Sequence, residues 1–190
     1  MEFFDVIHTR RAIRKYKTDP VPRVIMERIL DAANWAPSGM NMQQWEFIVV
    51  AGEKKQQIGE SYARFAETYT SSWDDLERRE SFLNFARSFG GAPLLVIALT
   101  KASNEPSTRK MHLESVSAAF ENLLLAACAE GLGTCWMTGP LQDEDSIRRI
   151  LDIPENKEIV AVTPVGYPDM VPEVPKRIDP DLKNKVTWVG

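Results

Sequence analysis

The chain of 190 residues has little cysteine and little histidine: Cys128, Cys135, His8 and His112 are all it contains. Two cysteines cannot form the disulfide framework of a small secreted domain, and these four residues offer no spacing typical of a metal site. We therefore expect two reduced, buried thiols, in keeping with a reducing cytosol, and no bound metal.

The sequence also lacks an excess of positive charge and any long hydrophobic run. Its net charge is −4, so any anion must be held by a local cluster of cations, and nucleic acid is not an expected partner. Its apolar runs reach about seven to nine residues, whereas a membrane-spanning helix needs about 20. The start, MEFFDVIHTRR, does not have the pattern of a signal peptide. We expect a cytoplasmic protein.

Glycine-rich phosphate loops, internal repeats and Gly/Ser linkers are absent as well. Hydrophobic residues make up 44% of the chain and charged residues 26%, which is typical of a globular protein with a buried core. One domain spanning residues 1–190 is the simplest expectation.

The spacing of apolar residues predicts an α+β fold with a mixed central sheet, because helices and strands alternate without regular βαβ units. The helix at 111–130 is apolar on nearly every side in its second half, which indicates either a central core helix or a helix in a subunit interface. The expected helices are 2–9, 23–35, 111–130, 143–151 and two within 53–89, and the expected strands are 47–50, 93–99, 134–138 and 158–166.

A basic cluster follows the first helix. Arg10, Arg11 and Arg14 each offer a planar fork of donors that suits phosphate and carbonyl oxygens. A solvated basic face is the alternative. The adjacent Lys176 and Arg177, in a proline-rich segment, could likewise meet a phosphate or be ordinary surface charge.

Two further segments could contact a heterocycle. Residues 36–45, APSGMNMQQW, join a helix to a strand, and amide side chains pair well with ring edges, although an ordinary turn has the same composition. Residues 131–140, GLGTCWMTGP, contain glycines that permit close approach of a ligand. Within the second segment, Gly131 is better interpreted as a helix C-cap.

Together these segments resemble the nitroreductase family. The resemblance covers nearly the whole chain and rests on RRAIRKY at 10–16, APSGMNMQQWEF at 36–47, GLGTCWMTG at 131–139 and PKR at 175–177. It implies an intertwined homodimer with two FMN sites in the subunit interface. It also implies an oxidoreductase that uses NADH or NADPH to reduce nitroaromatic, quinone or related small acceptors by ping-pong hydride transfer.

The resemblance implies that FMN is bound by residues from all four segments, and it implies no catalytic acid, base or nucleophile. Ala12 departs from the family, which often has Ser there, and Gln44 stands where many relatives carry Pro. The implied FMN-binding residues are Arg10, Arg11, Ala12, Arg14, Pro37, Ser38, Gly39, Asn41, Thr138, Gly139, Lys176 and Arg177.

The implied roles divide between the two ends of FMN. Arg10 would bind the phosphate, and Lys176 with Arg177 beside it would complete that site. Arg14 would lie near the N1 and C2-carbonyl side of the ring, where a cation stabilises reduced flavin. The backbone N–H groups of 138–139 would face the ring near N5.

The resemblance also divides contacts between subunits. Asn41 would contact FMN of its own subunit, whereas 37–39 would contact FMN bound mainly by the other subunit. The helix at 111–130 would pack against its twin, and the tail at 186–189 would wrap onto the partner.

Other functions remain open at this point. Residues 61–90 could form a substrate lid, as reductive dehalogenation or flavin destruction would require, or a helical hairpin that covers the dimer surface. A flavin-binding or storage protein with little turnover, and a small interaction module built on the apolar helix, are further alternatives.

Overall fold

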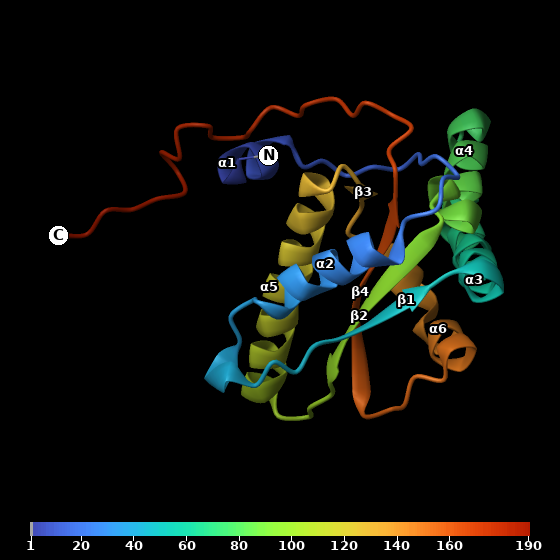
Figure 1. Cartoon of the computed structure of the whole chain (residues 1–190). Coiled ribbons are helices and arrows are strands. Elements are labelled where there is room, and N and C mark those ends of the chain that lie inside the picture. The colour runs from blue at the N-terminus through green and yellow to red at the C-terminus, as the bar shows by residue number, and fades with distance from the viewer. Residues whose placement is uncertain (1) are drawn as a thin grey trace.

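In the computed structural model, which describes residues 2–190, helices cover both faces of a four-stranded sheet (Figure 1). The helices are α1 (Phe3–Thr9), α2 (Arg23–Asn34), α3 (Gly52–Thr70), α4 (Leu76–Ser88), α5 (Pro106–Ala129) and α6 (Glu144–Leu151). The strands are β1 (Glu46–Val50), β2 (Leu94–Lys101), β3 (Gly133–Thr134) and β4 (Lys157–Gly166), in the order β1-β2-β4-β3. The predicted α+β class is confirmed.

The sheet differs from the predicted mixed sheet, because its four strands pair only in antiparallel fashion. Parallel pairing is confined to an isolated bridge between Ala12 and Thr134 at the β3 edge. There the Ile13 N–H donates to the Thr134 carbonyl at 2.9 Å. The basic segment after α1 is therefore attached to the sheet edge beside β3.

The strand expected at 134–138 ends early for a reason that lies in β4. Continuing the β3–β4 register places Cys135 opposite Pro164, which has no N–H to donate to a ladder. The Cys135 N–H donates instead to the Thr163 hydroxyl at 3.0 Å. The chain pairs with β4 again at Met137, so this segment follows the sheet edge with one interruption.

The core lies on both faces of the sheet, and β2 contributes to each in turn. Val96 and Ala98 pack in the cluster that includes α2 and α5, whereas Leu95 and Ile97 pack in the cluster that includes α3 and α6. Alternate residues of a strand face opposite sides. Because both sides are covered, β2 is a continuous apolar run in the sequence.

Helix α5 begins five residues before the predicted start, at Pro106, because Glu105 is an effective N-cap. The Glu105 carboxylate accepts the N–H groups of Ser107 and Thr108, and proline fits the first helical position. One face of α5 is buried in the core, including Leu124. The opposite stripe of Ser117, Glu121, Leu125 and Cys128 is only partly buried.

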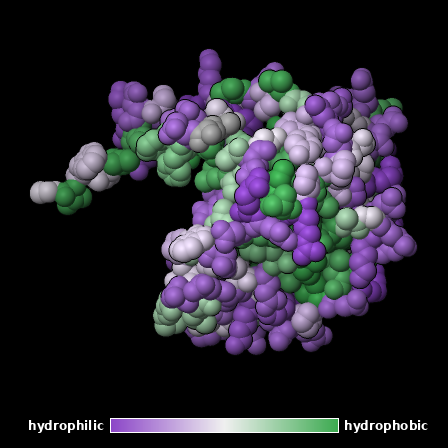
Figure 2. Space-filling view, viewed as in Figure 1, coloured by the Kyte–Doolittle hydropathy of each residue, from purple (hydrophilic) through white to green (hydrophobic). Residues whose placement is uncertain are grey.

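After β4 the chain is irregular and first runs along the basic segment, where the Lys17 N–H donates to the Tyr167 carbonyl and the Asp169 N–H to the Lys15 carbonyl. The end of the chain then stands clear of the body as a tail (Figures 1 and 2). Several of its apolar side chains are almost fully exposed, including Val171, Ile178, Trp188 and Val189. No helix in residues 2–190 is long and apolar enough to cross a membrane.

Candidate cofactor site

The basic segment borders a cavity of about 280 Å³ next to the end of α5. Arg10 and Arg11 line it together with Cys128, Thr134 and four residues of the chain that leaves β4, Pro168, Met170, Val171 and Pro172. Both arginines are partly buried, so the alternative of a fully solvated basic face is wrong for them. The cavity has two cations and no carboxylate among its lining residues.

Arg11 has a donor that no described residue satisfies. Its Nη1 donates to the carbonyls of His8 and Arg10, each at 2.7 Å, while its Nε is buried without a hydrogen-bond partner among residues 2–190. Leaving a buried donor unpaired costs about 1–3 kcal/mol. Arg10 is only loosely paired, with its Nε 3.8 Å from a Glu121 carboxylate oxygen. These cations fit the phosphate of a flavin mononucleotide.

The 138–139 turn lies against helix α3. A Cβ on Gly139 would lie 2.6 Å from the Tyr62 hydroxyl, so the turn approaches that ring as closely as glycine allows. Tyr62 is buried, and burial raises the pKa of its phenol. It therefore stays a neutral O–H donor. The buried residues Ile58, Tyr62 and Ala66 follow at intervals of four along α3, and this spacing is the sequence signal that could have found Tyr62.

Cys135 links this turn to the basic segment. Burial raises the pKa of its thiol, and the charges of Arg14 and Arg10 act in the opposite direction. Both cysteines are free, as predicted; Cys135 is buried, whereas Cys128 is only partly buried. The structure thus brings Arg10, Arg14 and the 135–139 segment together at one end of the sheet.

The polar loop lies elsewhere, beside the first half of α5 (Figure 1). The Gly39 N–H donates to the Ser115 hydroxyl at 3.2 Å, and a Cβ on Gly39 would lie 2.3 Å from the Met111 sulfur. Arg10 is near Glu121 instead, and six residues of helix separate Ser115 from Glu121 by about 9 Å. The loop and Arg10 therefore contact different turns of α5.

The role expected of Asn41, a contact with FMN of its own subunit, stays a prediction. Asn41 and Gly39 belong to the same short helix, η1 (Gly39–Asn41). Met40, Asn41 and Gln43 all have left-handed backbone, with φ of 54°, 54° and 47°. Such strain at non-glycine residues is concentrated at functional sites.

Lys176 and Arg177 are exposed in the tail. Four of the preceding residues 168–172 line the Arg10 cavity, so the tail begins at the site. The phosphate role of this basic pair stays a prediction.

A second cavity, of about 440 Å³, lies beside Arg14. The α3–α4 hairpin supplies its other walls, as Trp73, Arg78, Ser81, Phe82 and Phe85. The two helices predicted within 53–89 are confirmed, and buried Tyr62 and Phe89 hold the hairpin against the core. These five residues lie within 61–90, the segment expected to form a lid or a hairpin, but the sequence did not show that they meet Arg14.

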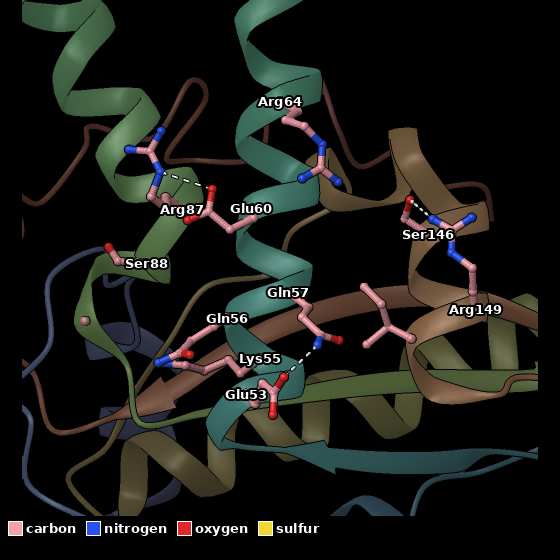
Figure 3. A pocket seen from close by; sticks show the side chains of 12 residues that line it. Glu53, Lys55, Gln56, Gln57, Glu60, Arg64, Arg87, Ser88, Ser146 and Arg149 are labelled. Carbon is pink, nitrogen blue, oxygen red and sulfur yellow. Dashed lines mark hydrogen bonds and ion pairs between the residues drawn. The ribbon is translucent and has the colours of Figure 1, made fainter.

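A larger cavity, of about 700 Å³, contains none of the predicted site residues (Figure 3). Its walls come from α3, α4 and α6 and are mostly charged or amide side chains. Within it Arg87 of α4 is paired with Glu60 of α3 at 3.4 Å. Volume alone therefore does not identify the cofactor site.

The family model of the nitroreductase family matches residues 7–167. The chain belongs to the nitroreductase family. That membership, with relatives named as NAD(P)H nitroreductases and a solved structure of 29% identity that contains FMN, makes it an FMN-dependent oxidoreductase.

Two curated relatives differ in the activity that their names give. An Archaeoglobus fulgidus protein, provisionally named NADH dehydrogenase/NAD(P)H nitroreductase, is 33% identical over 193 residues, which cover 98% of this chain and 99% of that protein. An iodotyrosine deiodinase of Thermotoga neapolitana is 33% identical over 177 residues, which cover 87% of this chain and 88% of that protein. The specific chemistry within the family is therefore left open.

The solved structures agree on the fold. An iodotyrosine deiodinase bound to FMN and 3-iodo-L-tyrosine has a TM-score of 0.76 at 29% identity, over 93% of this chain and 95% of that chain. An FMN- and NADPH-dependent nitroreductase from Sphigopyxis has a TM-score of 0.81 over the full length of both chains, and at 21% identity it supports the fold alone.

Proposed function

We propose that this protein uses NADH or NADPH to reduce nitroaromatic, quinone or related small acceptors by a ping-pong mechanism. The observation that carries the proposal is the unsatisfied, buried Arg11 Nε at a cationic cavity that adjoins the 135–139 segment. When bound there, FMN supplies the redox chemistry, taking two electrons from the nicotinamide and passing them to the acceptor.

The chain's own residues bind FMN and orient it. Arg10 and Arg11 neutralise the phosphate, and the unpaired Arg11 donor gains its acceptor. Arg14, on the same segment, supplies a positive charge at the ring end, and no more than about 13 Å of chain separates it from Arg10. Tyr62 fixes the Gly139 turn whose backbone faces the ring. No side chain needs to act as an acid or base.

The site is completed by a homodimer. The loop contacts the first half of α5 and leaves Met40 exposed, and in the proposed dimer its residues 37–39 contact the partner's cofactor. Apolar side chains that a monomer would leave in water also lie on α1, where Phe3 and Phe4 are about two-thirds exposed, and on the tail. Large exposed apolar patches mark interfaces. The partly buried stripe of α5 is the proposed contact between the two copies.

Steady-state rates test the ping-pong mechanism. With the purified holoprotein, a nitroaromatic acceptor and either NADH or NADPH, double-reciprocal plots at several acceptor concentrations should be parallel. Intersecting lines would contradict the mechanism, because they require both substrates to be bound together.

Reductive dehalogenation is a second candidate, favoured by the similarity to iodotyrosine deiodinases. In that reaction two electrons and a proton replace halide by hydrogen on the ring. It predicts that 3-iodotyrosine, in place of the nitroaromatic, is converted to tyrosine and iodide. Release of iodide at a rate equal to NAD(P)H oxidation would favour this candidate over nitro reduction.

A further inference from the structure

The cavity beside Arg14 has aromatic walls that are held in place from behind. Phe82 lies within ring-contact distance of Tyr62, Tyr69 and Trp73, with centroids 5.6–6.3 Å apart. Phe85 packs on Phe82 at 6.4 Å. Such a cluster gives a flat ligand rigid faces for stacking.

The same cavity has two positive charges and no carboxylate among its lining residues. The Arg78 guanidinium lies 4.7 Å from the Trp73 ring centroid, and neither Arg78 nor Arg14 forms an ion pair within the described part of the chain. Glu77 and Glu80, the acids nearest to Arg78 in sequence, do not line the cavity, and Asp75 is the N-cap of α4 and accepts the Arg78 backbone N–H at 2.9 Å. Ser81, one turn after Arg78, adds a hydroxyl to the lining.

The position of this cavity relates it to the cofactor. Arg14 lines the cavity and belongs to the segment whose other end, Arg10 and Arg11, lines the phosphate cavity. The end of α4 is also attached to this segment, because the Tyr16 N–H donates to the Gly90 carbonyl at 2.9 Å. A ligand in the cavity would therefore lie at the ring end of the cofactor segment.

We propose that this cavity selects an acceptor with a carboxylate on its aromatic ring, so that Arg78 pairs with the carboxylate while Trp73, Phe82 and Phe85 hold the ring. The inference rests on the proposed function and narrows its substrate class. A guanidinium suits a carboxylate because the two planar groups can form two parallel hydrogen bonds. A volume of about 440 Å³ falls in the range of small-molecule sites.

The test compares 4-nitrobenzoate with 4-nitrobenzamide, which has the same shape and no charge. Binding to the oxidised holoprotein is measured by calorimetry, and KM and kcat are measured with NADH or NADPH. We expect Arg78→Gln to raise the Kd and KM for nitrobenzoate about tenfold, a modest factor because the pair is exposed to solvent. The Kd and KM for nitrobenzamide and the kcat should change less than twofold.

Arg87→Gln is the matched control, since it removes the same charge from the same helix at a site paired with Glu60 in the other cavity (Figure 3). Arg87→Gln should leave the Kd and KM for both ligands unchanged. The proposal would be overturned if Arg78→Gln raised the Kd for both ligands equally, or if Arg78→Gln and Arg87→Gln raised the Kd for nitrobenzoate equally. It would also be overturned if the wild-type protein bound nitrobenzamide as tightly as nitrobenzoate. Because binding is measured without turnover, failure of the reductase function would appear separately, as selective binding without NAD(P)H oxidation.

Discussion

Replacing Leu125 with glutamate should give a folded monomer that has lost most of its FMN. Leu125 lies on the partly buried stripe of α5, with Ser117, Glu121 and Cys128 on the same stripe. A carboxylate at position 125 would be desolvated against the partner at a cost of several kcal/mol, and Glu121, one turn earlier on the same stripe, would repel it. The monomer's own core does not use this face, so its helix content should be preserved.

Loss of FMN should accompany loss of the dimer because the proposed site takes residues 37–39 from the partner. Light scattering gives the mass, and flavin absorbance after gel filtration gives the occupancy. Leu124→Glu is the informative comparison: Leu124 is 2% exposed and packs in its own subunit's core, so that variant should unfold. A Leu125→Glu monomer with full FMN would show that the site is not shared, and a dimer of unchanged mass would place the interface elsewhere.

Gly90→Ala should destabilise the fold strongly and weaken FMN binding together. Gly90 has φ of +67°, and a Cβ there would lie 2.1 Å from the Arg14 carbonyl oxygen, which is a backbone atom. The alanine must therefore push the cofactor segment away from the α4 end. We expect a cost of about 3 kcal/mol or more in the free energy of unfolding, at the high end for a single substitution.

The control for backbone strain alone is Gly52→Ala. Gly52 has φ of +58°, and a Cβ there would meet no atom within 4 Å. Its cost should be about 1–2 kcal/mol, with no change in FMN affinity. Urea unfolding and FMN titration of both variants measure the difference. Equal costs, or unchanged FMN affinity in Gly90→Ala, would show that contact with Arg14 does not position the segment.

Elements with a strong local signal could be predicted from the sequence. The apolar run of β2 and the periodicity of α2 marked core elements near their true bounds, because burial on a sheet or helix face leaves a pattern in the residues themselves. The start of α5 was missed because the first residues after Pro106 are polar and add nothing to an apolar stripe. The capping by Glu105 is what marks the true start. The early end of β3 depends on Pro164, about 30 residues away in the chain.

The candidate site could be predicted only in part. The Arg10–Arg14 and 131–139 motifs carry the family resemblance, and the fold places them together. The spacing of Ile58, Tyr62 and Ala66 indicates a buried face of α3. The proximity of Tyr62 and of the Arg78 cavity to the cofactor segment is created by tertiary packing of α3 and α4, which the sequence does not show.

The most direct test of the central claim is a visible absorbance spectrum of the purified protein under anaerobic conditions, recorded before and after addition of NADH and then NADPH. We predict an oxidised flavin spectrum that bleaches within the time of mixing with at least one donor. A flavin that remains oxidised with both donors would contradict the reductase function and favour a storage protein. A colourless protein that also failed to take up added FMN would contradict the cofactor site itself.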